Sequence, residues 1–173
     1  MSEATKIDGK AYAANLRADI GRKVAILKQQ HGLTPGLSVV LVGEDPASEV
    51  YVRNKGKATL EAGMKSNTFT MAEDSSHEAV MAKVEELNGD PSVHGILVQL
   101  PLPDQVDPDA IINAINPDKD VDGFHTLNVG RLNSGQDAMV PCTPVGCMVM
   151  LKEVIGDLTS KQAIVVGRSN IVG

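Results

Sequence analysis

The stretch LSVVLVGEDPASEVYVRNK, residues 37–55, decides the fold that we predict for this chain. Residues 37–42 are a continuous apolar run of strand length, and Gly43 with the turn residues Asp45 and Pro46 closes the run. A helix is expected to follow at once. A strand that passes through a short turn into a helix is the first half of a parallel α/β unit.

The expected helix places three polar side chains on one stripe. Tyr51 and Lys55 are four residues apart and Ser48 lies a further turn back, so a phenol would lie within reach of an amine. Arg53 and Lys57 are rotated away and are expected to be solvated. Small apolar residues continue the stripe, and such surroundings disfavour an ammonium, so Lys55 could accept a proton near neutral pH. The alternative is a core tyrosine beside a lysine that snorkels from the helix flank.

The rest of the chain alternates helices with strands. Apolar spacing predicts a helix over residues 9–30, ended by Gly32. Residues 68–71 and 94–100 are predicted strands, and a capping box at residues 75–78 begins the helix between them. Strands that are apolar on both faces and separated by helices indicate a mostly parallel sheet flanked by helices, an α/β fold.

The second half of the chain is less regular. A short helix is predicted over residues 107–115, and residues 123–140 are expected to be mainly loop. Thr143 is the expected N-cap, and Pro144 the first residue, of a helix with enough apolar surface to bridge two domains. A last strand is expected at residues 163–166.

Composition limits the classes of function. Hydrophobic residues make up 42% of the 173 residues, but aromatic residues only 2%, so little is available to stack on exposed bases. The net charge of −6 also argues against nucleic-acid binding. Residues 1–60 carry nine basic and six acidic groups, whereas residues 61–130 carry three and thirteen. The surroundings of Lys55 would therefore suit a small anionic ligand.

The cysteines and the hydropathy of the sequence indicate the cellular compartment. Cys142 and Cys147 are five residues apart, with no His at ligand spacing, so we expect reduced thiols and neither a metal site nor a disulfide framework. The first ten residues contain no apolar run, and no run of eighteen apolar residues occurs. We expect a cytoplasmic protein without a membrane segment.

Two polar positions are expected to approach Lys55. Ligands of parallel sheets bind outside the carboxyl ends of the strands, and Gln99 ends the strand predicted at residues 94–100. The acidic run at residues 118–123 resembles a calcium loop, but its twelfth position is Val129 and not the required Glu, so we reject calcium. A carboxylate at Asp122 could instead accept two parallel N–H donors from an aminopyrimidinone. The alternative for Asp122 is a solvated turn.

The carboxyl-terminal residues 167–173 lie where a strand should give way to a helix, which is the place of a phosphate-binding turn. They form G-R-S-x-x-V-G, so the generic dinucleotide fingerprint is absent. Arg168 could pair with a ribose 2′-phosphate, which favours NADP over NAD. The Y-x-x-x-K spacing of Tyr51 and Lys55 also occurs in short-chain dehydrogenases, but there the glycine-rich turn comes first, so we reject that match.

Taken in order, five motifs resemble the bifunctional methylenetetrahydrofolate dehydrogenase/methenyltetrahydrofolate cyclohydrolase family. They are S-x-x-Y-x-x-x-K at residues 48–55, G-I-L-V-Q-L-P-L-P at 95–103, K-D-V-D-G-F at 119–124, P-C-T-P at 141–144 and G-R-S-x-x-V-G at 167–173. The resemblance implies a folate-binding catalytic domain in residues 1–141, a linking helix in 142–160, and the first strand of a Rossmann-type NADP-binding domain in 161–173.

The resemblance also implies roles for single residues. Lys55 would be the catalytic lysine, with Tyr51 as its partner over the folate ring and Gln99 orienting it. Asp122 would bind the pterin. The remaining implied contacts are to folate from Ser48, Val98 and Leu100, and to NADP from Gly167, Arg168 and Ser169.

The implied chemistry has two steps. Hydride passes from 5,10-methylenetetrahydrofolate to NADP, and water then adds to the cationic methenyl carbon, with Lys55 moving both protons, to give 10-formyltetrahydrofolate. A homodimer, and a supply of one-carbon units to purine, methionine and histidine biosynthesis, are further expectations from the family.

Two other interpretations stay open. Family members continue well beyond residue 173, so we expect the chain to be the amino-terminal part of a longer protein, without dehydrogenase activity of its own. One alternative is a non-catalytic folate-binding or dimerisation module. The other is a generic amino-acid-dehydrogenase-like domain without pterin affinity, which the setting of Asp122 disfavours.

Overall fold

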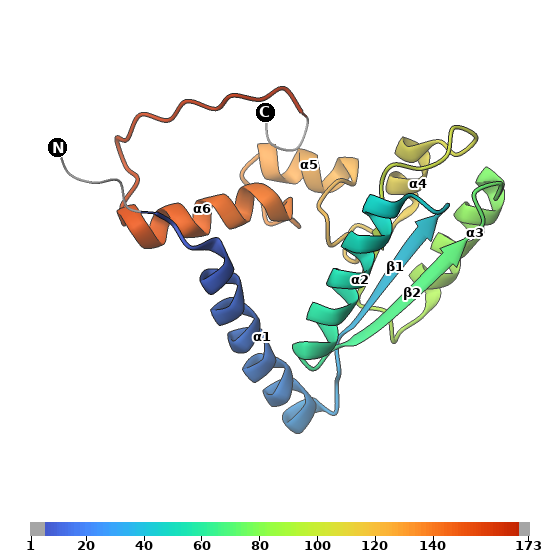
Figure 1. Cartoon of the computed structure of the whole chain (residues 1–173), viewed down its shortest axis with the longest axis horizontal. Helices are drawn as coiled ribbons and strands as arrows, with labels where there is room; N and C mark the ends of the chain where they lie inside the picture. Colours follow the sequence, from blue (N-terminus) through green and yellow to red (C-terminus); the bar gives the residue numbers. More distant parts are fainter. Residues whose placement is uncertain (1–5, 170–173) are drawn as a thin grey trace.

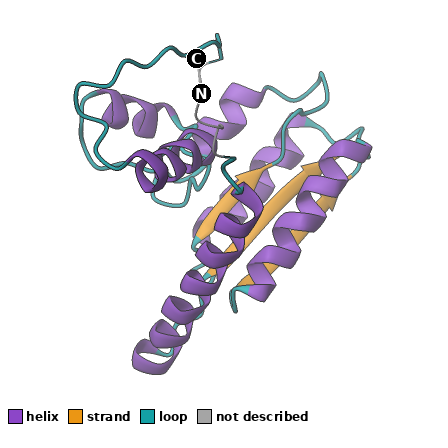
Figure 2. Ribbon diagram, turned by 60° about the vertical axis from the view of Figure 1, so that its left-hand side comes forward, coloured by secondary structure: helices purple, strands orange, loops and turns teal. Residues whose placement is uncertain are grey.

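Three parallel strands form the centre of the chain, and helices lie on both of their faces (Figure 1, Figure 2). The computed structural model describes residues 6–169. Its elements, in chain order, are α1 (Gly9–His31), β1 (Gly36–Val42), α2 (Pro46–Glu61), β2 (Lys65–Met71), α3 (His77–Gly89), β3 (Gly95–Val98), α4 (Pro108–Ala114), α5 (Thr126–Asn133) and α6 (Cys142–Ile155). The strand order is β2-β1-β3, and β1 pairs in parallel with both neighbours. The predicted α/β fold with a parallel sheet is confirmed.

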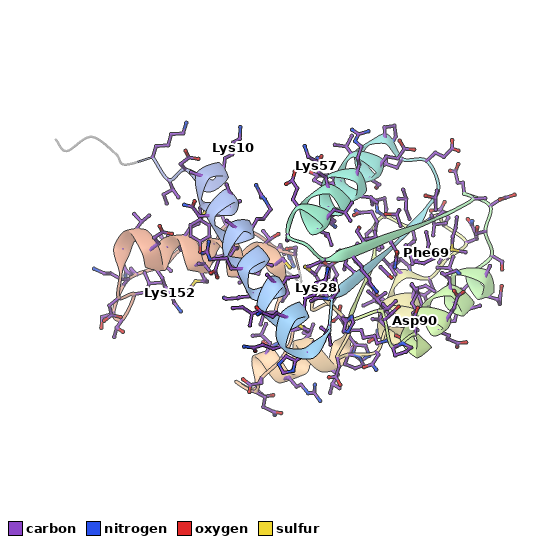
Figure 3. The ribbon with its side chains drawn as sticks, turned by 90° about the horizontal axis from the view of Figure 1, so that it is seen from below. Lys10, Lys28, Lys57, Phe69, Asp90 and Lys152 are labelled. Carbon is purple, nitrogen blue, oxygen red and sulfur yellow. The ribbon has the colours of Figure 1, made fainter. Side chains whose placement is uncertain are left out.

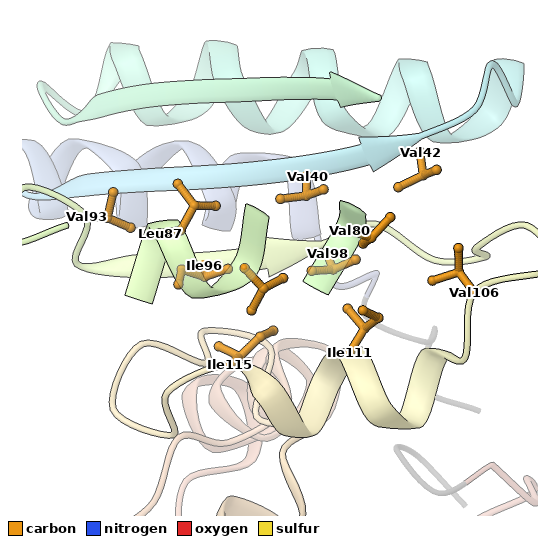
Figure 4. Close-up of a cluster of buried hydrophobic side chains, with 11 residues drawn as sticks. Val40, Val42, Val80, Leu87, Val93, Ile96, Val98, Val106, Ile111 and Ile115 are labelled. Carbon is orange, nitrogen blue, oxygen red and sulfur yellow. The ribbon is translucent and has the colours of Figure 1, made fainter. Parts of the chain in front are cut away.

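Side chains of β1 alternate between two apolar clusters, as the two-residue period of a strand requires. Val40 and Val42 face the larger cluster, where the sheet packs on α3 and α4 (Figure 4). Val39 and Leu41 face the opposite side, where Val52 of α2 covers them. The strand is therefore buried on both faces, which explains why its sequence is a continuous apolar run.

Helix α1 is mostly exposed. The carboxylate of Asp8 accepts hydrogen bonds from the Lys10 and Ala11 amides at 3.1 and 3.0 Å, and Gly32 ends the helix with φ of 65°. Of its 23 residues only Val24 is fully buried. The amino-terminal end of α1 lies beside α6, away from the sheet (Figure 1). Within residues 6–169, no helix is both long enough and apolar enough to span a membrane.

Helix starts differ from prediction in two places. The predicted capping box at residues 75–78 is wrong by one residue, because Ser76 is the N-cap of α3 and its hydroxyl accepts the Ala79 amide at 3.2 Å. Helix α6 begins at Cys142, before the predicted Thr143 cap. Pro144 fits there because the first-turn amides of a helix have no intrahelical acceptor, so the N–H that proline lacks is not missed.

Two segments also differ from expectation. Residues 123–140, predicted to be mainly loop, contain α5, and the His125 ring nitrogen Nδ1 accepts the Leu127 amide at 2.9 Å where this helix begins. The strand predicted at residues 163–166 is not formed, and Ile164 and Val166 are 90% and 96% exposed. A strand needs a neighbour for its backbone hydrogen bonds, and no described segment pairs with this one.

The start of β1 tests the packing of the sheet. A Cβ on Gly36 would overlap the Ser92 carbonyl oxygen, whereas a Cβ on Gly89, the last residue of α3, would meet no atom within 4 Å. We expect Gly36→Ala to lower the free energy of unfolding by about 1–3 kcal/mol, because the backbone must shift. Gly89→Ala, the matched control, should leave stability unchanged or raise it by up to about 1 kcal/mol. Urea titrations would measure both, and equal midpoints for the two variants would contradict the packing described here.

Candidate active site

A cavity of about 590 Å³ lies between α1, α2 and the face of the sheet that α2 covers. Its walls are mostly apolar, and the polar side chains among them are Lys55, Thr59, His94, Asp122 and Cys142. A large apolar cavity with a few converging polar groups is the usual form of a small-molecule site. This arrangement makes it the candidate site of the chain.

The cavity reaches further than the sequence predicted. Gly36 and Gly95, the first residues of β1 and β3, line it, so it extends over the face of the sheet toward the amino ends of the strands. The reason is the path of α2, which runs back along β1 after the turn at Asp45. Lys55 is the tenth residue of α2 and therefore lies about 14 Å along the helix axis from its start.

The side-chain amine and the backbone carbonyl of Lys55 each form a hydrogen bond with another side chain. Its side chain is half-buried, and Nζ donates a hydrogen bond to Oε1 of Gln99 at 3.1 Å. One turn further along, the Thr59 hydroxyl donates to the Lys55 carbonyl oxygen at 2.8 Å. Arg53 and Lys57, predicted to be solvated, are exposed, and Figure 3 labels Lys57 on α2. Of the three cations, only Lys55 lines the cavity.

Gln99 follows β3 directly, and both ends of its amide are engaged. Its backbone N–H donates to the Val40 carbonyl at 2.9 Å, which continues the sheet by one residue. Its side-chain Nε2 donates to the Leu100 carbonyl at 2.7 Å. Because the amide nitrogen is directed to that carbonyl, the oxygen faces Lys55 and can accept from the amine.

Asp122 lies on a turn that is attached to β3. The Ile96 amide donates to the Lys119 carbonyl at 2.7 Å, and Ile96 and Asp120 form a parallel bridge. Gly123 has φ of 68°, and a Cβ there would come within 2.8 Å of the Met139 carbonyl oxygen. The close approach of residues 139–141 to Gly123 places the beginning of α6 beside Asp122.

The electrostatics of Asp122 and Cys142 are coupled. Burial raises the pKa of the Asp122 carboxyl, the positive charge of Lys55 opposes this, and the charge of Asp120 adds to it. Burial, and then the charge of Asp122, also raise the pKa of the Cys142 thiol. The Cys142 thiol donates a hydrogen bond to the Val121 carbonyl oxygen at 3.6 Å. A thiol with a raised pKa is a poor nucleophile near neutral pH.

Of the predicted catalytic and folate-binding residues, only Lys55 and Asp122 line this cavity. Gln99 reaches it only through its hydrogen bond to Lys55. Ser48 is 3% exposed, and its backbone amide donates to the Asp45 carboxylate at 2.8 Å, so it belongs to the start of α2. The Tyr51 side chain is 62% exposed. Val98 packs in the cluster on the α3 side of the sheet, whereas its neighbour Leu97 lines the cavity. The functional roles assigned to these residues stay predictions.

Leu100 borders a smaller cavity of about 220 Å³ that Gly123 and Phe124 also line. Sequence reasoning missed Thr59 and Leu97 as cavity residues. Both could have been found from spacing, because Thr59 is four residues after Lys55 on a helix and Leu97 alternates with Val98 on a strand.

The predicted cofactor residues lie apart from regular structure. Gly167, Arg168 and Ser169 are exposed. Residues 170–173 of the predicted phosphate-binding turn lie outside the described residues. In the part of the chain that the structure describes, no group of three or more His, Cys, Asp or Glu side chains could hold a metal ion.

Family models match most of the chain. Residues 7–122 match the catalytic domain of tetrahydrofolate dehydrogenase/cyclohydrolase, and residues 141–173 match its NAD(P)-binding domain. The Bifunctional protein FolD of Caulobacter sp. (strain K31) is 58% identical over 173 residues, which are 100% of this chain and 58% of that protein. Bifunctional protein FolD 2 of Roseobacter denitrificans is 61% identical over 98% of this chain and 57% of its own length. The chain thus spans less than two thirds of these relatives.

Solved structures show the same fold. The bifunctional enzyme FolD of Campylobacter jejuni superimposes with a TM-score of 0.94 at 46% identity, over 98% of this chain and 60% of that chain. The Trypanosoma brucei N5,N10-methylenetetrahydrofolate dehydrogenase-cyclohydrolase, solved with NADP cofactor and an inhibitor, also gives 0.94, at 35% identity, over 100% of this chain and 59% of its own.

The raised pKa of Asp122 predicts a pH-dependent stability. The folded chain holds this proton more tightly than the unfolded chain, so the carboxyl contributes stability at low pH that is lost as the pH rises through its folded-state pKa. We therefore expect Asp122→Asn to raise the urea midpoint at about pH 7, and to raise it less as the pH approaches the ordinary carboxyl range. Asp74→Asn, at an exposed position, controls for the amide itself. A midpoint for Asp122→Asn that is lower than the parental value at neutral pH would contradict the burial cost.

Proposed function

The chain belongs to the tetrahydrofolate dehydrogenase/cyclohydrolase family, and we propose that the whole protein oxidises 5,10-methylenetetrahydrofolate with NADP and hydrolyses the methenyl product to 10-formyltetrahydrofolate. One observation carries the proposal. Lys55 Nζ donates to Gln99 Oε1 at 3.1 Å, on the wall of a cavity that Asp122 also lines. The name of the 46% identical Campylobacter jejuni protein, methylenetetrahydrofolate dehydrogenase/cyclohydrolase, supports the same pair of activities.

Asp122 is proposed to bind the pterin. Its two carboxylate oxygens can accept two parallel N–H donors from the aminopyrimidinone edge, as a carboxylate does from Arg. Burial makes the ionised carboxylate costly in this apolar cavity, and hydrogen bonds from a ligand would offset that cost. The apolar walls supplied by Leu37 and Leu97 suit the flat faces of the ring.

Lys55 is proposed to move the protons of the hydrolysis. Water adds to the methenyl carbon, and the amine accepts the proton that the water releases; the amine then delivers a proton to the ring nitrogen that leaves. The positive charge of the methenyl substrate favours a neutral amine beside it. Gln99 would keep the amine on the cavity wall while its proton changes place.

The hydride step is proposed to rely on positioning by the cavity rather than on acid or base groups. When bound, the nicotinamide of NADP supplies the hydride acceptor. Arg168 is the cation suited to a ribose 2′-phosphate. The described residues around it are exposed and form no enclosing cradle, so we derive no step from this segment.

The remaining site residues have more limited proposed roles. The exposed ring of Tyr51 could pack on a folate ring that projects from the cavity. Val98 would act through its backbone, since its side chain is in the core, and Leu100 would contact folate from the neighbouring cavity. Ser48 would support the start of α2, the helix that bears Lys55.

Three broader assignments belong to the same proposal. We place the catalytic domain in residues 1–141, the linking helix in 142–160 and the start of the cofactor domain in 161–173; the family matches at residues 7–122 and 141–173 support a boundary near residue 141. Free thiols at Cys142 and Cys147 support a cytoplasmic location. Exposed apolar side chains such as Leu16 of α1 and Met148 of α6 support contact with a further apolar surface, in keeping with a homodimer.

A second candidate is a folate-binding module without catalysis. It is favoured for these 173 residues because the whole lining of the main cavity falls within residues 20–142, inside a chain that covers 57–58% of its relatives. Calorimetry of the 173-residue chain with tetrahydrofolate would separate the two candidates. Binding without hydrolysis of the methenyl compound would support the module for this part of the protein.

Replacing Lys55 tests the proposed chemistry. In the whole protein we expect Lys55→Ala to lower the rate of methenyltetrahydrofolate hydrolysis by about 100-fold or more, because the proton carrier is lost, and to spare part of the dehydrogenase rate. The decrease in methenyl absorbance measures the rate of hydrolysis. Lys57→Ala, on the same helix but exposed, should hydrolyse at the parental rate. A Lys55→Ala enzyme as fast as the Lys57→Ala enzyme would exclude the role given to Lys55.

A further inference from the structure

We propose that Asp120 and Asn128 are positioning residues that hold the turn of Asp122 in its folate-binding geometry. The inference rests on the proposed function, because it takes Asp122 as the pterin-binding group. Neither Asp120 nor Asn128 lines the main cavity, so each would act through Asp122.

Asp120 is a buried carboxylate whose hydrogen bonds run to α5. Its side chain is 1% exposed, and its Oδ2 accepts both the His125 backbone amide and the Asn128 Nδ2, each at 2.9 Å. An ionised group so deeply buried is costly unless its oxygens are well bonded. The backbone carbonyl of Asp120 accepts the Gly123 amide at 3.2 Å and so closes the turn on which Asp122 lies.

Asn128 completes this arrangement from α5. It is also 1% exposed, and its Nδ2 donates a second hydrogen bond, to the Pro117 carbonyl at 2.9 Å. The Asn128 amide nitrogen thus links Pro117 and Asp120, which lie on either side of Lys119 in the sequence. Both hydrogen atoms of the Asn128 amide are engaged, so a smaller side chain cannot replace it.

The other side of the segment is fixed to the sheet and to α3. Lys119 Nζ donates to the carbonyls of Leu87, Asn88 and Asp90 at 3.1, 2.8 and 2.8 Å, at the end of α3, where Figure 3 labels Asp90. The backbone of Lys119 bonds to Ile96 of β3. The turn is therefore held at the sheet, at α3 and at α5. Asp120 and Asn128 form the α5 connection, and Asp120 lies two residues before Asp122.

These contacts determine where the Asp122 carboxylate lies relative to Lys55. Lys55 comes from α2 and Asp122 from a turn after β3, so their separation depends on how the turn is fixed to the sheet and to α5. Loss of the α5 connection should let Asp122 drift without disturbing the Lys55–Gln99 hydrogen bond. Folate affinity should then fall while the chemical step on bound substrate is kept.

The test uses the whole protein with Asn128→Ala, Asp120→Ala and Asp120→Asn. Methenyltetrahydrofolate hydrolysis supplies KM and kcat, and calorimetry with tetrahydrofolate supplies Kd. We expect the two alanine variants to raise KM and Kd about tenfold, with kcat at saturation within about twofold of the parental value. Asp120→Asn should restore KM to about the parental value, because its amide oxygen can accept the same two N–H donors. Asn133→Ala is the matched control, since Asn133 is exposed on the same helix and its Nδ2 donates to the Val129 carbonyl within that helix.

Each outcome decides the proposal. Unchanged KM in the alanine variants, a fall in kcat without a rise in KM, or a failure of Asp120→Asn to restore KM would overturn it. If Asp120→Ala does not fold, Asn128→Ala carries the test, because it removes only one of the two donors to Asp120. The Asp122→Asn variant distinguishes a failure of the pterin role of Asp122 from a failure of the positioning roles of Asp120 and Asn128. If Asp122→Asn leaves KM unchanged, the pterin role of Asp122 is wrong; if it raises KM while the alanine variants do not, only the positioning inference fails.

Discussion

The hydrogen bond from Lys55 Nζ to Gln99 Oε1 joins the two elements on which the site depends. Lys55 comes from α2, which runs back over the sheet, and Gln99 directly follows β3. The two residues are 44 positions apart in sequence, so the bond exists only when the parallel β1–β3 pairing has formed. The same pairing fixes Ile96, and through it the turn of Asp122. The geometry of the site therefore depends on the pairing of the strands.

The position of Asp122 opposes stability and serves the proposed function. A carboxyl in an apolar cavity has a raised pKa, because burial disfavours its charge more than Lys55 restores it. A folding core alone would not select an acidic residue there. A ligand with paired N–H donors would make the burial useful, since the carboxylate gains partners when the ligand binds. A side chain that lowers stability but can gain partners from a ligand is typical of binding sites.

The sequence was sufficient where local pattern and tertiary structure agree. The apolar run at residues 37–42 and the valine spacing of α3 predicted the sheet and its packing, because both faces of β1 are buried. Helix spacing and a strand end also suggested that Lys55 and Gln99 approach each other. The prediction of a strand at residues 163–166 was wrong because a strand forms only beside a neighbouring strand, which the local sequence does not reveal. The extent of the cavity and the hydrogen bonds of Asp120 depend on contacts between distant segments, which periodicity does not encode.

A crystal structure of the whole protein with a 5,10-bridged tetrahydrofolate analogue would test the central claim most directly. The account predicts that the pterin enters the cavity between α1, α2 and the sheet, with its N–H edge within hydrogen-bond distance of the Asp122 carboxylate and its bridging carbon next to Lys55 Nζ. A pterin bound elsewhere, with the Lys55 amine turned into bulk solvent, would contradict it.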